Sequence, residues 1–298
     1  MQHTGSKLST KSHGVSLKNK TAQLRQIKPL LDVDFSLKAF SKSFDAINHI
    51  VQHNEDVPEA QLKNLTDGMT IFAENLNQNI ASLQAKLKTF SNKKEPDKST
   101  RKHITKVLMQ RKQLQAQLAG MCLVRTHLAE ILSIGKDITS DVVVHALESS
   151  NITPASTLNE TLKYLTDFVK TKNESLQQHL DALLEFESKL PIHAPCVHEA
   201  LRATKAAALK FKNNHLKHLE SDLIQLQAKI ARKSAQETFE TEIARINGIK
   251  ADTKTQASAI SDLIGPTTEA GQVAVAALQT QIDKMQAFLE TVRSTDPN

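Results

Sequence analysis

The sequence has few of the residues that sheets, catalytic loops and disulfide frameworks need. Its 298 residues include no Trp, one Tyr, eight Gly, eight Pro and two Cys. Sheets favour aromatic and β-branched residues and use Gly-rich turns, so these low counts favour an all-helical chain. Cys122 and Cys196 lie far apart in the sequence and neither belongs to a CxxC pair. This argues against a disulfide framework and predicts either a reducing compartment or indifference to redox state.

Long hydrophobic runs are also missing. No stretch of 18 consecutive apolar residues occurs, and residues 1–31 lack the apolar core of a secretory signal peptide. We therefore expect a soluble chain that is cytoplasmic, or that is exported into a host cell without a classical signal peptide.

Acidic residues are absent from the first 31 positions. The six Lys and Arg residues there account for the whole formal charge of +6, so the rest of the chain is neutral. A neutral body argues against a dedicated nucleic-acid binder. We interpret residues 1–31 as a disordered basic tail. An organelle presequence and a leaderless secretion signal, of the kind that bacterial effectors use, are the alternatives.

What the chain does have is a heptad pattern of apolar residues. The stretch 196–247 contains 52 residues without Gly or Pro, and Leu209, Leu216, Leu223 and Ile230 follow one another at intervals of seven. Such spacing places apolar groups on one narrow seam of a helix. A helix of this length would span about 80 Å. We therefore predict an all-α, elongated antiparallel helical bundle with coiled-coil-like packing and one very long helix, about residues 196–247.

The heptads and the Pro and Gly residues also predict where the helices begin and end. After Ile230 the apolar stripe changes phase, so the second half of the long helix should face different neighbours. Residues 32–298 should form one bundle, or two stacked sub-bundles at about 32–230 and 231–298. The helices are expected at 34–53 (begun by Asp32 or Asp34), 58–90, 97–134 (capped by Gly135), within 135–155 (short), 156–190, 196–247, 252–264 and 267–293.

Candidate metal and catalytic motifs are incomplete. Zinc needs three or four converging ligands. No His grouping in this sequence comes with the further ligands that would complete a zinc site. No Glu-x-x-His, His-Glu-x-x-His, Gly-x-Ser-x-Gly or phosphate-binding Gly-rich loop occurs. We predict no catalytic residue, no metal and no cofactor. The His groupings considered are His49 with His53, His215 with His218, and His193 with Cys196 and His198.

Basic residues gather around the expected turn between the second and third helices. Between Lys86 and Lys112 ten Lys or Arg residues face only Glu95 and Asp97. Such a tip could contact anionic lipid or phosphate, and a solvated helix end is the alternative. Few aromatic residues lie nearby to stack on bases, which argues against single-stranded nucleic acid. The residues proposed for an anionic surface are Lys93, Lys94, Lys98, Arg101, Lys102 and Lys106.

Together these features predict a non-enzymatic helical scaffold or adaptor. Its exposed helix faces would bind helical protein partners or a second copy of the chain, and it could act as a secreted bacterial effector. The alternative is a peripheral membrane protein that uses the basic tip and tail. In heptads and composition the chain resembles spectrin-like rods, curved membrane-binding dimers, the helical domains of membrane-tethering and fusion regulators, and coiled-coil effectors of intracellular bacteria, but no motif assigns it to a family. Spectrin-like repeats generally carry a Trp that is absent here.

Overall fold

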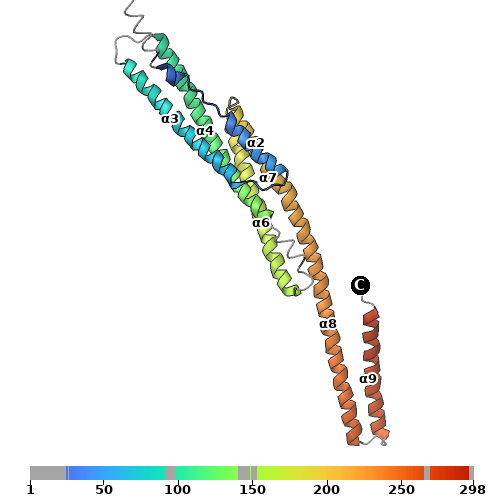
Figure 1. Cartoon of the computed structure of the whole chain (residues 1–298). Helices are drawn as coiled ribbons and strands as arrows, with labels where there is room; N and C mark the ends of the chain where they lie inside the picture. Colours follow the sequence, from blue (N-terminus) through green and yellow to red (C-terminus); the bar gives the residue numbers. More distant parts are fainter. Residues whose placement is uncertain are drawn as a thin grey trace, which may run out of the picture. The chain divides into compact units, whose positions relative to one another are not determined.

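The computed structural model consists of packed helices (Figure 1). It describes residues 25, 27–91, 98–139, 148, 153–264 and 269–294, and no strand occurs among them. The predicted all-α helical bundle is confirmed. In chain order the elements are α2 (Lys38–Gln52), α3 (Glu59–Ser91), α4 (Lys98–Ile138), α6 (Ala155–Lys189), α7 (Pro195–Lys210), the π-helix η1 (Phe211–Leu216), α8 (Lys217–Ile264) and α9 (Glu269–Ser294).

Contacts within the chain divide it into two compact units. Unit 1 comprises Met1–Ser140 and Phe168–Leu219, and unit 2 comprises Asp141–Asp167 and Glu220–Asn298. This division differs from the expected one between residues 230 and 231, because the first turns of α6 group with the C-terminal helices. The elongated shape of the whole chain stays a prediction. The expected turn at 92–97 lies outside the described residues, as do most of the tail 1–31 and most of the short helix expected within 135–155.

Unit 1 is built around α4. This helix packs against α3, α7 and η1, while α2 packs against α7 and α3 (Figure 1). The expected seams supply the core, since Leu76 and Leu83 of α3 and Met121 of α4 are fully buried. Polar contacts join α6 to its neighbours: Lys172 donates to Asp137 of α4 at 2.5 Å, and Lys205 of α7 donates to Glu187 at 2.6 Å.

The bundle begins a few residues before the expected boundary at residue 32. Residues 27–31 are helical, and Ile27 is fully buried in a core cluster with Leu76 and Leu83. Two polar side chains bind the backbone of residues 30–33. Asn79 donates to the Leu30 carbonyl oxygen at 3.0 Å, and Arg111 donates to the Val33 carbonyl oxygen. The last residues of the predicted basic tail are therefore part of the fold.

The long helix contains a π-helical segment that heptad counting missed. Up to Phe211 buried seam residues are spaced by four and three (Val197, Leu201, Thr204, Ala208, Phe211). From Leu216 they are again spaced by three and four (Leu219, Leu223, Leu226, Ile230). The step from Phe211 to Leu216 is five residues. In an uninterrupted α-helix five residues turn about 140° past one full turn, and η1 takes up this extra residue. Leu209 is therefore off the seam and 44% exposed, contrary to the prediction.

Three expected helix ends were wrong. α2 begins at Lys38, after Leu37, and neither Asp32 nor Asp34 caps it. Gly135 does not end α4, which continues to Ile138. Gly135 instead provides space, because a Cβ there would lie 2.3 Å from the ring of Phe211. The expected separate helix at 252–264 is the continuous end of α8, which passes through Gly248.

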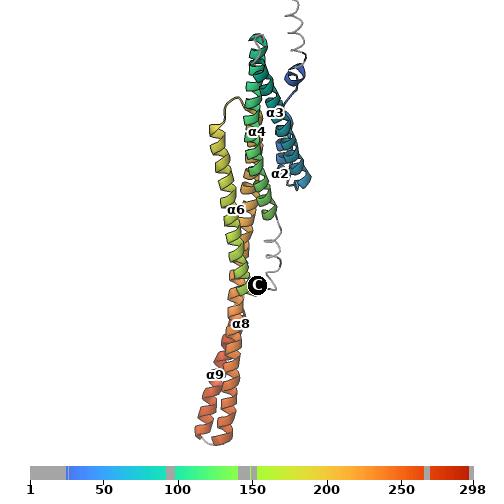
Figure 2. The same cartoon turned by 90° about the vertical axis from the view of Figure 1, so that its left-hand side faces the viewer.

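In unit 2, α8 and α9 lie side by side and antiparallel (Figures 1 and 2). Ile282 and Leu289 of α9 are buried, and Lys250 of α8 donates to Gln286 of α9. Glu237 of α8, at a position expected to be apolar, accepts a hydrogen bond from the amide of Ala155 at 3.2 Å. It thereby pairs one of the free amides at the start of α6. This contact explains why a carboxylate lies on the inner face of α8.

Within the described residues, α4 is long and apolar enough, by length and composition, to cross a membrane. Its most apolar 18-residue window has a mean hydropathy of 1.3, and 39% of that window is buried. Core helices of soluble proteins have the same composition. Contacts of α4 with α3, α7 and η1 account for the buried part of this window, whereas Met109 and Leu123 of α4 are 58% and 42% exposed.

Candidate functional site

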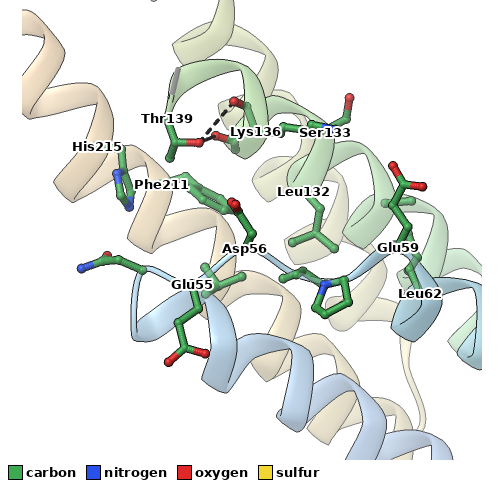
Figure 3. Close-up of a pocket in the computed structure, with 16 residues that line it drawn as sticks. Glu55, Asp56, Glu59, Leu62, Leu132, Ser133, Lys136, Thr139, Phe211 and His215 are labelled. Atoms are coloured by element: carbon green, nitrogen blue, oxygen red, sulfur yellow. Dashed lines mark hydrogen bonds between the residues drawn. The ribbon is translucent and has the colours of Figure 1, made fainter. Parts of the chain in front are cut away.

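A concavity in unit 1 lies beside η1. It has a volume of about 620 Å³ and is formed by the α2–α3 connection, the start of α3, the end of α4 and η1 (Figure 3). Its floor is apolar: Val51 and Phe211 are buried, and Leu62 and Leu132 are half-buried. Figure 3 shows Leu132 and Phe211 pointing into the space from two different elements.

Two uncommon backbone features meet at this pocket. Asn54 adopts the left-handed conformation with φ of 58°, and it is the one non-glycine residue with positive φ among those described. Asn tolerates this region better than most residues. The second feature is η1. π-Helical turns are rare in proteins, but those that occur often lie at functional sites. Both features shape the pocket wall, because Asn54 turns the chain towards Pro58 and η1 presents Phe211 and His215 to the space.

The mouth of the pocket is acidic. Glu55, Asp56 and Glu59 are exposed, and within the described part of the chain their carboxylates form no hydrogen bond or ion pair. Asp56 points towards Phe211, whereas Glu55 points away from the pocket (Figure 3). Lys136 is the one cationic residue lining the space. Burial, with Lys210 and His218 nearby, lowers the pKa of the remaining basic group, His215. The mouth is therefore negative at neutral pH.

This pocket was not predicted from the sequence. Its residues come from three separate segments, and none of them forms a motif. Two signals were present: the five-residue step between Phe211 and Leu216 in an otherwise regular seam, and Gly135 inside a strong helical pattern. The first marks the π-helix, and the second marks the space that the Phe211 ring occupies.

The predicted basic tip is only partly available for binding. Lys93 and Lys94 lie outside the described residues. Arg101 donates to the carbonyl oxygen of Phe90 and is half-buried, so it joins α4 to the end of α3. The other three residues, Lys98, Lys102 and Lys106, are exposed and spaced by four, so they share one face of α4.

The structure does not bring the His and Cys groupings together as a metal site. Among the described residues no three His, Cys, Asp or Glu side chains converge. The rings of His49 and His53 stack at 4.1 Å. His198 contacts the Pro191 carbonyl oxygen at 3.3 Å. The third grouping, His193 with Cys196 and His198, contains a thiol. Burial and the neighbouring Glu199 raise the pKa of Cys196, so this thiol is neutral at pH 7.

A histidine pair that sequence spacing could not reveal joins α4 to α6. The Nδ1 atoms of His127 and His179 lie 3.0 Å apart, although the residues are 52 positions apart. Burial and the neighbouring His179 lower the pKa of His127. Whichever Nδ1 carries the proton donates to the other, and this contact links the two helices.

Comparisons with known proteins add no family to this description. The chain matches no protein-family model, no curated protein and no solved structure.

Proposed function

We propose that the protein is a non-enzymatic helical scaffold or adaptor that binds helical partners. The observation that supports this most is the incomplete cover of the α8–α9 hairpin. Six apolar residues of this hairpin are half-buried, whereas the central seam residues Leu76, Leu83 and Met121 of unit 1 are fully buried. A helix gains most of its stability by packing its apolar face, so a further helix on this hairpin would be stabilising. The half-buried residues are Phe239, Ile243, Ile246, Val275, Leu278 and Met285.

The hairpin also carries large apolar side chains that neither helix covers. Val273 is 67% exposed, and Phe288 is 54% exposed. Aromatic and apolar anchors of this kind carry much of the binding energy in protein interfaces. The site of action, in the cytoplasm or in a host cell after export as an effector, is part of the same proposal and rests on the acid-free residues 1–31 alone.

Substitution of the two exposed side chains tests the proposal. Chemical cross-linking of the parent should join partners to Lys250, Lys254 or Lys284 of the hairpin. The variant Val273→Ser/Phe288→Ser should lose these cross-links. Size-exclusion chromatography with light scattering then distinguishes a second copy from another protein. The control Ile71→Ser/Ile192→Ser removes two exposed apolar side chains of unit 1 and should retain every hairpin cross-link. A monomeric parent without hairpin cross-links, or equal loss in both variants, would contradict the proposal.

The exposed stripe of Lys98, Lys102 and Lys106 supports a second candidate, a peripheral membrane protein. Each lysine near an anionic surface contributes about 1 kcal/mol. The parent should therefore sediment with phosphatidylserine vesicles, and the triple Lys→Glu variant should not. The same change at three exposed lysines elsewhere, Lys42, Lys63 and Lys170, should have a smaller effect. Equal sedimentation of all three proteins would exclude this candidate.

A further inference from the structure

We propose that the pocket beside η1 is a second docking site, for a basic amphipathic helix of a partner protein. The site lies in unit 1 and does not depend on the hairpin interaction proposed above. Its floor is apolar and its mouth is negative. A helix with leucine side chains on one face and lysine or arginine beside them is complementary to both.

The apolar part of the interaction comes from the floor. Leu62 and Leu132 are half-buried, so part of each remains open to a ligand. Phe211 is 7% exposed and its ring lies against Gly135, which gives the floor a fixed aromatic base. A pocket of about 620 Å³ lies within the range of about 300–1,000 Å³ that is typical of ligand sites. It can accept apolar side chains from one helix face.

The charged part comes from the mouth. Glu55, Asp56 and Glu59 have no partner within the described residues, and they outnumber Lys136. Neutral His215 adds no positive charge. Unpaired carboxylates beside an apolar floor favour a ligand that carries cations next to apolar groups, and they disfavour an acidic ligand.

The pocket wall carries conformations that regular helices avoid. A left-handed Asn and a π-helical turn are each less favourable than the regular alternative, and both border this space. Asn54 ends α2, since the amide of Glu55 donates to the Ile50 carbonyl oxygen at 3.1 Å, and η1 takes up the extra residue of the seam. Together they fix the shape of the wall that a bound helix would contact.

Binding of a model helix by the full chain tests the proposal. The probe is a fluorescein-labelled peptide of about 18 residues, or five helical turns, with Leu on one face and Lys on the other. Fluorescence anisotropy should show saturable binding. The same peptide with Glu in place of Lys should not bind, and spermine, which has charge but no apolar face, should not displace the Lys peptide at equal charge concentration.

Variants locate the binding. The change Glu55→Gln/Asp56→Asn/Glu59→Gln should weaken peptide binding by about tenfold, since the exposed charge pairs with the peptide lysines are lost. Leu132→Ser should weaken peptide binding severalfold, although it leaves the charge of the pocket unchanged. The control Asp67→Asn/Glu74→Gln/Glu174→Gln neutralises three exposed carboxylates elsewhere in unit 1 and should stay within about twofold of the parent.

Circular dichroism should show that every variant is folded. Three results would overturn the proposal: no binding of the Lys peptide, equal weakening by the mouth and control variants, or displacement by spermine. None of these results depends on the hairpin, so they are separate from failure of the proposed function.

Discussion

Replacing Gly135 with Ala is expected to destabilise unit 1, although Ala is the better helix former. The added Cβ would lie 2.3 to 2.6 Å from three ring carbons of Phe211, so the ring must move. Overpacking of a core costs about 1–3 kcal/mol, whereas the change from Gly to Ala within a helix gains about 1 kcal/mol. We expect a net decrease of up to about 2 kcal/mol in the free energy of unfolding.

Gly248 provides the matched control. It also lies inside a helix, but no atom would lie within 4 Å of its Cβ. Gly248→Ala should therefore increase the stability of unit 2 by up to about 1 kcal/mol. Urea unfolding followed by circular dichroism measures both changes. In the background of Phe211→Ala, Gly135→Ala should no longer be destabilising. A stabilising Gly135→Ala in the parent background would contradict the packing described for Phe211.

The heptad pattern predicted the helices because it reflects burial. Leu76, Leu83 and Met121 lie at the predicted seam positions and are fully buried. The helix ends were less predictable, because they depend on tertiary contacts. Gly135 resembles a cap in the sequence, and only the neighbouring ring of Phe211 shows why it lies inside α4.

The pocket could not be predicted for a related reason. A π-helical turn adds one residue to a seam, so a count of seven back from Leu216 across η1 gives Leu209 instead of the buried Ala208. Leu209 was assigned to the seam in this way and is exposed. The pocket also depends on contacts between segments far apart in the sequence, such as Asn54 and His215, and no local pattern records such contacts.

Deleting Asn213 is expected to leave the protein folded with nearly unchanged stability. The deletion shortens the step from Phe211 to Leu216 to four residues, so the seam keeps its alternation of three and four without a π-helix. Asn213 is exposed, so no buried side chain is lost. Deletion of Arg202, which is also exposed, should strongly destabilise the protein. The π-helix remains in this variant, and the helix before the deletion turns by about 100°, so Val197 and Leu201 leave the core. Removal of such residues costs about 2–5 kcal/mol each.

The most direct test of the account is the urea unfolding of these two deletion variants, compared with the parent by circular dichroism. The account predicts that deletion of Asn213 changes the free energy of unfolding by less than about 1 kcal/mol, whereas deletion of Arg202 removes several kcal/mol or prevents folding. If the two deletions destabilise the protein equally, the extra residue is not taken up at η1, and the proposed continuity of the apolar seam is wrong.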